Sequence, residues 1–208
     1  MLTQHIIRTA VEAALAEDAP YGDITCETTI PADETGSAHL TARERGVMSG
    51  IAVFTAAFTA QNPGIGVSPL IADGERFQRG QILATVEGPV RDLLAAERIA
   101  LNFTQRMSGI ATHTAELVSL LQGSGITLLD TRKTTPNLRI FEKYAVTVGG
   151  GTNHRYNLSD GVMLKDNHIG AAGGIKPAVA RARAYAPFVR KIEVETETLE
   201  QVREAVEA

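Results

Sequence analysis

The residues after Ile126 alternate between short apolar runs and helical segments, and this alternation is the strongest constraint on the fold. The pattern predicts strands and helices by turns at 126–130, 138–148, 161–165, 178–185, 192–196 and 199–206. The strand segments are almost continuously apolar, which is typical of a parallel sheet that is buried on both faces. We therefore expect an α/β arrangement of parallel βα units, forming either an open sheet or a barrel.

A complete barrel of eight βα units occupies about 250 residues by itself. After Ile126 the 208-residue chain has room for only the first few of these units, and its last helical segment has no stop signal. The pattern favours a barrel that is truncated within this sequence over a small open sheet.

The N-terminal part has a different pattern. Thr3 is placed to cap a helix that runs to about Asp18, and a second helix is expected at 51–60. Strand patterns at 37–45, 67–71 and 81–86, separated by turn residues, predict a small antiparallel sheet with helices on one face.

A long helix is expected after Pro89, although Ser108 and Gly109 are placed to break it. Its apolar stripe has helical spacing and consists of Leu93, Ala96, Ala100, Phe103, Met107 and Ile110. We place the domain boundary in this helical region, which gives an N-terminal domain at 1–112 and a C-terminal domain at 113–208.

Composition excludes several classes of protein. The chain is 44% hydrophobic, which suffices for a sizeable core, and its net charge of -4 argues against nucleic-acid and membrane-surface binding. No apolar run reaches the roughly 18 residues of a membrane span, and the N-terminus does not resemble a signal peptide. Cys26 is the only cysteine, so an intrachain disulfide is excluded and a reduced, cytoplasmic setting is expected.

Against this acidic background, basic side chains gather between Leu128 and Ile169. They are Arg132, Lys133, Arg139, His154, Arg155, Lys165 and His168. Ligands of parallel βα folds bind at the carboxyl ends of the strands, where 130–133, 165–167 and Glu195 are expected. One such cation alone is most simply a solvated loop residue, but a set on successive strand ends predicts a site for a multiply charged anion.

Several local features admit more than one interpretation. Thr134 and Thr135, followed by Pro136, are typical of a helix start whose free amides can receive an anion. The three glycines at 149–151 either end a helix or let the backbone approach a ligand, and their spacing matches neither a Walker loop nor a dinucleotide fingerprint.

The histidines have no partner at metal-ligand spacing, so anion recognition is favoured over zinc binding for His154 and His168. Lys165 is compatible with a Schiff base of the kind that barrel aldolases form, but its many cationic neighbours suit carboxylates and phosphates better. A carboxylate among cations, at Glu195, suggests Mg²⁺ or a sugar hydroxyl as its partner.

The motifs DTRKTTPNLR, EKYAVTVGGGTNHR, LKDNHI and KIEVETETLEQ, in this order and spacing, resemble the quinolinate phosphoribosyltransferase family. EDAPYGDIT and AERIALNFTQRMSGIAT resemble its N-terminal half. The resemblance implies an N-terminal open-faced α+β sandwich and a C-terminal α/β barrel. It also implies a homodimer in which the N-terminal domain of one subunit covers the barrel mouth of the other.

The activity implied by the resemblance is transfer of phosphoribose from phosphoribosyl pyrophosphate to the ring nitrogen of quinolinate, with decarboxylation. The products are nicotinate mononucleotide, pyrophosphate and CO₂, and Mg²⁺ accompanies the pyrophosphate. Fixed cations suit this reaction, because they offset repulsion between the substrates and stabilise the departing pyrophosphate. We expect no dedicated general base, since the pyridine nitrogen needs no deprotonation.

The resemblance also implies roles for individual residues. The quinolinate carboxylates are expected to bind to residues of two subunits, namely Arg132, His154 and Arg155 of one and Arg98 of its partner. Lys133 and Lys165 are expected between the two substrates, and Glu195 is expected to face the ribose or its magnesium.

The sequence departs from the family in one respect. Family members continue past this point with a later strand-end aspartate and glycine-rich phosphate loops, and these motifs do not occur in the 208 residues. We therefore expect the chain to hold the quinolinate half of the site and to be inactive in this form. A molybdenum-transport paralogue and a non-catalytic ligand-binding fragment remain alternatives, although Asn153 and the intact DNHI favour the quinolinate enzyme.

Overall fold

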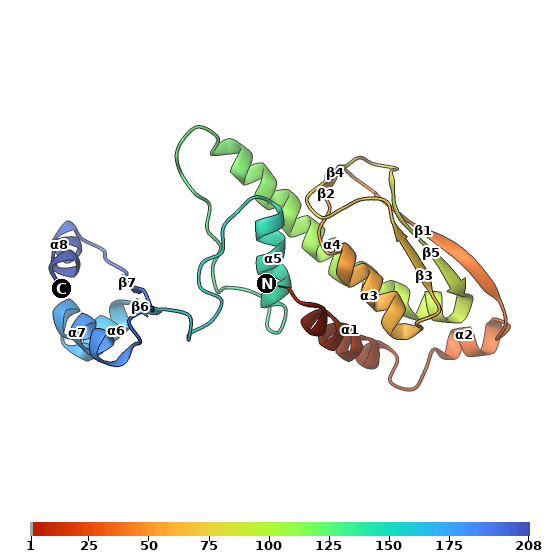
Figure 1. The fold of residues 1–208 in the computed structure, drawn as a ribbon, viewed down its shortest axis with the longest axis horizontal. Helices are drawn as coiled ribbons and strands as arrows, with labels where there is room; N and C mark the ends of the chain where they lie inside the picture. The colour runs from red at the N-terminus through yellow and green to blue at the C-terminus, as the bar shows by residue number, and fades with distance from the viewer. Residues whose placement is uncertain (1) are drawn as a thin grey trace. The chain divides into compact units, whose positions relative to one another are not determined.

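A computed structural model describes residues 2–208, which form two compact units that divide after His154 (Figure 1). The elements of the first unit are α1 (Gln4–Asp18), α2 (Ile24–Thr29), β1 (Thr35–Thr41), β2 (Gly46–Val47), α3 (Ile51–Gln61), β3 (Gly66–Pro69), β4 (Arg76–Phe77), β5 (Ile82–Pro89), α4 (Val90–Leu120) and α5 (Arg139–Val148). Those of the second are β6 (Val162–Leu164), α6 (Asp166–Ala172), α7 (Ile175–Tyr185), β7 (Ile192–Val194) and α8 (Leu199–Glu207). Among residues 2–208, no helix is both long and apolar enough to cross a bilayer.

The predicted antiparallel sheet is confirmed, with strand order β1-β5-β3. The register pairs Ala38 with Val86 and Leu40 with Ala84. Ala84 and Val86 are buried in one core with α1, α3, α4 and α5, in which α3 and α4 pack against the sheet and α1 and α5 pack against these two helices. A separate two-stranded ribbon joins β2 to β4.

Asp73 ties three parts of this unit together. The N-cap residue of α3 is Gly50, which has no side chain to accept the first helical amides. The Asp73 carboxylate accepts the amide protons of Gly50 and Ile51 instead, each at 3.0 Å. Its Oδ2 atom also accepts the hydroxyl of Tyr144 on α5, at 2.8 Å. A loop residue thus caps α3 from a distance and links it to α5.

Helix α4 is unbroken over 31 residues, so the expected break at Ser108 and Gly109 is wrong. The Ser108 hydroxyl accepts the Ser49 amide at 3.1 Å and donates to the Ser49 carbonyl at 3.2 Å, so it serves packing instead of a turn. The predicted apolar stripe is confirmed where it is deepest, at Ala96, Ala100 and Met107. The domain boundary expected at 112/113 lies inside this helix and stays a prediction.

Two expectations for residues 126–136 are wrong. The strand expected at 126–130 is only an isolated parallel bridge between Leu129 and Thr152. The helix predicted at 138–148 is confirmed as α5, but the helix start that residues 134–136 suggested is wrong, since α5 begins at Arg139. The Thr135 amide is already held by Glu142 Oε2 at 3.1 Å, and Asn137 has a φ of 64°, outside the helical region. The amide of Thr135 is therefore not available to an anion.

The glycines at 149–151 let the end of α5 lie against α4. A Cβ atom on Gly149 would lie 2.4 Å from the Ala111 carbonyl oxygen, and one on Gly151 would lie 2.7 Å from Val146 Cγ1. The Gly149 amide also donates to the Ala145 carbonyl at 3.0 Å, as the C-terminal residue of a helix does. Of the two interpretations of this run, helix termination with close packing is the one that these contacts support.

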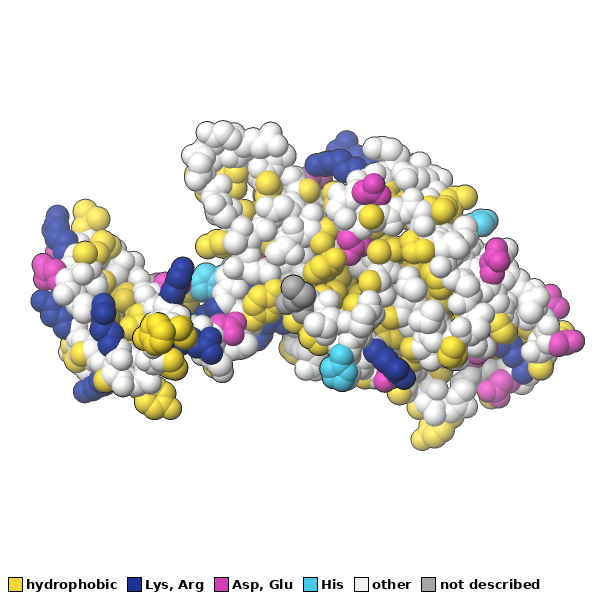
Figure 2. All heavy atoms as spheres, in the orientation of Figure 1, with side chains coloured by type: hydrophobic (Ala, Val, Ile, Leu, Met, Phe, Trp, Pro, Cys, Tyr) yellow, Lys and Arg dark blue, Asp and Glu magenta, His cyan; other side chains and the backbone are white. Residues whose placement is uncertain are grey.

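The second unit contains the predicted parallel strands. β6 and β7 pair in parallel, with Val162 opposite Ile192 and Leu164 opposite Val194. Helix α7 packs its buried Ile175 and Val179 against Leu164. Figure 2 shows hydrophobic side chains among basic ones on this unit's surface. The most exposed large apolar residues here are Phe188, Tyr185 and Val206.

Helix α6 was not predicted, and residues 165–167 were expected only at the carboxyl end of a strand. The helix begins where the Lys165 amide donates to His168 Nδ1, at 3.0 Å. It ends at Gly173, whose φ of 85° is left-handed.

Close packing at Gly149 gives a stability prediction. Gly149→Ala should lower the free energy of unfolding by about 1–3 kcal/mol, because the added methyl group overlaps a backbone carbonyl. The matched control is Gly109→Ala, at a position in α4 where a Cβ atom meets nothing within 4 Å. This change should instead stabilise the chain, by about 0.5–1 kcal/mol. Urea unfolding measures both, and a Gly149→Ala variant as stable as the parent would contradict the packing.

Candidate functional site

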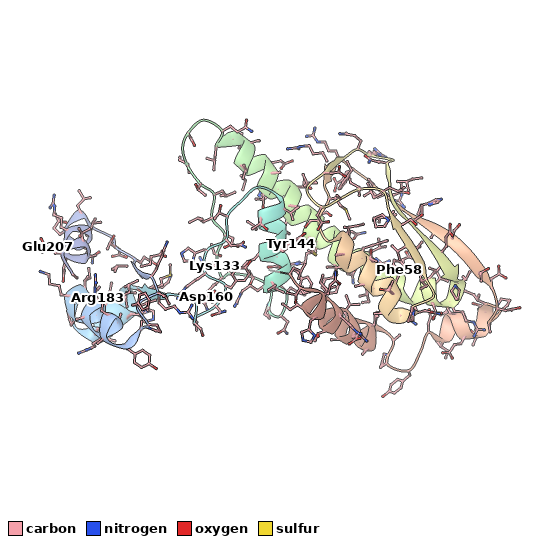
Figure 3. The ribbon with its side chains drawn as sticks, in the orientation of Figure 1. Phe58, Lys133, Tyr144, Asp160, Arg183 and Glu207 are labelled. Atoms are coloured by element: carbon pink, nitrogen blue, oxygen red, sulfur yellow. The ribbon has the colours of Figure 1, made fainter. Side chains whose placement is uncertain are left out.

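Residues 130–135, hereafter the cation loop, carry Arg132 and Lys133 between the Leu129 bridge and α5. The loop is folded by its own hydrogen bonds. The Lys133 amide donates to Thr131 Oγ1 at 3.0 Å, and the Thr134 amide donates to the Arg132 carbonyl at 3.0 Å. The two cations therefore project from an ordered turn, and Figure 3 labels Lys133 there.

Arg132 has the feature most indicative of a ligand. Its Nε atom is buried and has no hydrogen-bond partner among the described residues. A buried donor without an acceptor costs about 1–3 kcal/mol, and a guanidinium is the group best suited to bind a carboxylate in a forked geometry. A bound carboxylate oxygen is the simplest partner for this atom.

His154 is fixed beside the cation loop through its backbone. Its amide donates to Asp130 Oδ1 at 2.8 Å, and its carbonyl accepts a hydrogen bond from Lys143 Nζ at 3.0 Å. The Asp130 amide also donates to the Thr152 carbonyl at 3.1 Å. Of the predicted site residues, Arg132, Lys133 and His154 thus belong to one hydrogen-bonded region of the first unit.

Two buried charged residues of α5, Glu142 and Lys143, support this region. Lys143 is 1% exposed and forms an ion pair with Asp130, while Glu142 is 8% exposed and binds Arg106 and the Thr135 amide. Burial opposes ionisation of Glu142, but hydrogen bonds from Arg106 and Thr135 outweigh it and hold its pKa below the usual value.

Sequence reasoning missed both residues. The sequence signal for them was their position between the apolar residues Phe141 and Ala145, which the structure buries at 2% and 0% exposure. Buried residues on both sides of a charged pair mean that the pair itself faces the protein interior, where charges need partners.

The second unit brings Lys165 and Glu195 together. They follow the parallel strands β6 and β7, and their charged groups lie 2.8 Å apart. Lys165 and Glu195 therefore lie at the same edge of the sheet, as expected for residues that follow neighbouring parallel strands. Arg155 belongs to the same unit. Its guanidinium donates to the Gly161 carbonyl at 3.0 Å, just before β6, and lies 3.5 Å from Met163 Sδ, within β6.

The side chains of this region do not form a metal site of their own. In the part of the chain that the structure describes, no group of three or more His, Cys, Asp or Glu side chains is placed to hold a metal ion. Glu195 is engaged with Lys165. These residues do not form a protein cage for Mg²⁺, and a metal role for Glu195 stays a prediction.

Arg98 is exposed on α4, in the first unit. It lines an open groove of about 1190 Å³ whose wall also includes apolar side chains of α4 and the sheet region. Among these side chains are Leu94, Leu101, Leu40 and Leu83.

Comparison with known proteins agrees with this arrangement. Models of the quinolinate phosphoribosyl transferase N-terminal and C-terminal domains match residues 23–108 and 110–208. The crystal structure of NadC from Streptococcus pyogenes is 46% identical, with a TM-score of 0.94, over 100% of this chain and 73% of that one. The chain belongs to the quinolinate phosphoribosyltransferase family. The resemblance drawn from the four motifs is therefore confirmed.

Other members of the quinolinate phosphoribosyltransferase family give the same result. A nicotinate-nucleotide pyrophosphorylase structure from Francisella tularensis is 36% identical, with a TM-score of 0.93, over 100% of this chain and 73% of that one. A probable nicotinate-nucleotide pyrophosphorylase of Bacillus subtilis is 44% identical over 92% of this chain and 66% of that protein. A mitochondrial quinolinate phosphoribosyltransferase of Nicotiana glauca is 43% identical over 97% of this chain. The chain spans 58% of the length of this last relative.

The buried Glu142 carboxylate should make stability depend on pH. Its folded-state pKa lies below its unfolded value, so its contribution is present above the unfolded pKa and is lost as pH falls through the folded pKa. Glu142→Gln should therefore lower the free energy of unfolding by about 1–3 kcal/mol at neutral pH. The difference from the parent should shrink in acid.

Urea unfolding between pH 7 and pH 3 measures this difference. The matched control is Glu12→Gln, which removes an exposed partner of Arg8 on α1 and should change stability little at any pH. A Glu142→Gln deficit that stays constant down to pH 3 would contradict the proposed role of the carboxylate charge.

Proposed function

We propose that this chain binds quinolinate and carries the quinolinate site of an enzyme that transfers phosphoribose to it from phosphoribosyl pyrophosphate. The observation that carries the proposal is the buried Arg132 Nε atom without a partner, on an ordered loop in a member of this family. A carboxylate supplies the missing acceptor. His154, fixed next to the loop, and Arg155 are proposed to bind the remaining carboxylate charge of the substrate.

The proposed reaction joins the pyridine nitrogen of quinolinate to the ribose carbon that loses pyrophosphate, and releases the 2-carboxylate as CO₂. Lys133 is exposed and Lys165 is about half exposed, so both are accessible to phosphate or carboxylate groups. Their proposed task is to offset repulsion between two anions and to stabilise charge on pyrophosphate. Glu195, paired with Lys165, is proposed to meet the ribose.

Magnesium is proposed to enter with phosphoribosyl pyrophosphate. Mg²⁺ commonly binds through one or two carboxylates together with substrate phosphates, and it keeps several waters. That mode agrees with a chain whose described residues offer no metal cage. When bound, the ion would neutralise charge on the pyrophosphate.

We also propose a homodimer in which Arg98 reaches the quinolinate site of the partner. The support is its exposed position on α4, beside an open groove that includes Leu94, which is 44% exposed. An exposed apolar surface next to a guanidinium is typical of an interface that binds an anion. A cytoplasmic location is proposed from the single cysteine, and the acidic composition argues against nucleic acid or a membrane as a partner.

Isothermal titration calorimetry with quinolinate tests the proposal. The parent chain should bind with an affinity that weakens as salt increases. Arg132→Ala should cost about 2–5 kcal/mol of binding free energy, because it removes one partner of a desolvated charge pair. Arg79→Ala, an exposed arginine of the first unit, is the matched control and should bind as the parent does.

Nicotinate, which lacks one carboxylate, should bind more weakly than quinolinate. A parent chain that gives no heat with quinolinate would contradict the proposal and favour a non-catalytic fragment. Borohydride trapping of a carbonyl substrate on Lys165 would instead favour aldolase chemistry.

A further inference from the structure

We propose that α5 positions the cation loop through three side chains, Arg139, Glu142 and Lys143, hereafter the α5 clamp. They are positioning residues that act on the substrate through the loop. The effect on quinolinate rests on the proposed function, whereas the effect on the loop does not.

The α5 clamp holds the cation loop at both ends. At the start of the loop, Lys143 forms its ion pair with Asp130. At the end, Glu142 Oε2 accepts the Thr135 amide at 3.1 Å. Arg139 Nε donates to the neighbouring Thr134 Oγ1 at 3.0 Å. The three clamp residues are spaced i, i+3 and i+4, so they lie on one face of the helix.

Only four residues lie between Asp130 and Thr135, and two of them are Arg132 and Lys133. A segment this short, held at both ends and bonded internally, has few conformations left to it. The backbone that carries the two cations is therefore ordered before any ligand arrives. Preorganisation of this kind raises affinity because less conformational entropy is lost on binding.

Burial makes the clamp resistant to opening. Lys143 is 1% exposed and the Asp130 side chain is 7% exposed, so separating them would leave charge uncompensated inside the protein. Lys143 also donates to the His154 carbonyl, and Asp130 accepts the His154 amide. One ion pair thus sets the positions of both the cation loop and His154.

The other end of the clamp is fixed to α4. The Arg106 guanidinium donates to Glu142 and to the Thr135 hydroxyl. Glu142 therefore connects the longest helix of the chain to the last residue of the cation loop. The three clamp residues and Arg106 all belong to helices of the first unit.

Amide hydrogen exchange by NMR tests the effect of the α5 clamp on the loop. Lys143→Met should speed exchange at the His154 and Thr134 amides by about tenfold or more, the factor that loss of one net hydrogen bond gives. Asp130→Asn combined with Lys143→Met removes both charges, and it carries the test if the single variant does not fold.

Tyr144→Phe is the matched control on the same helix. Its hydroxyl contacts Asp73 and not the loop, so the variant should lose stability without faster exchange at His154 or Thr134. Unchanged exchange in the Lys143 variants, or equal acceleration in Tyr144→Phe, would overturn the clamp.

Quinolinate calorimetry on the same variants tests the positioning role. The Lys143 variants should bind about 10- to 100-fold more weakly than the parent, whereas Tyr144→Phe should bind as the parent does. Faster exchange with unchanged quinolinate affinity would overturn the positioning role. If the parent itself does not bind quinolinate, the proposed function fails and the exchange measurements alone decide whether the clamp exists.

Discussion

The buried ion pair between Lys143 and Asp130 is the interaction on which the candidate site depends. Both charges are almost fully removed from water, and such a pair is favourable only when further hydrogen bonds complete it. The His154 amide and carbonyl supply those bonds. The contacts that stabilise the ion pair are therefore the same contacts that place His154. The cation loop begins at Asp130, one residue of this pair.

Helix α4 supplies the frame that holds these contacts. On one side its hydroxyl groups bind the backbone of the small ribbon, where Thr112 Oγ1 accepts the Val47 amide at 2.8 Å and Ser108 accepts that of Ser49 at 3.1 Å. On another side Arg106 reaches Glu142 of α5, while close packing at Gly149 brings the end of α5 against Ala111. Ser108, which suggested a break in the helix, instead binds the backbone of Ser49.

The spacing of apolar residues predicted those helices and strands whose position is set by the local sequence. The antiparallel sheet, the parallel pair β6 and β7, and the helices α1, α3, α7 and α8 follow from apolar spacing and turn residues. The spacing failed at residues 126–130, where only an isolated bridge forms, and at α6. Lys165 was recognisable because it follows a strand, and Arg132 and Lys133 because they follow an apolar run, whereas the buried Glu142 and Lys143 carry no such local mark. Their roles appear only when α5 is folded against the loop.

A crystal structure of the protein with quinolinate bound tests the central claim most directly, since it shows which atoms meet the carboxylates. We predict a carboxylate oxygen within hydrogen-bond distance of Arg132 Nε, with residues 130–135 in the same conformation as in the ligand-free chain and the ion pair between Lys143 and Asp130 intact. Quinolinate bound away from Arg132, or a cation loop that refolds to reach it, would contradict a preformed carboxylate site.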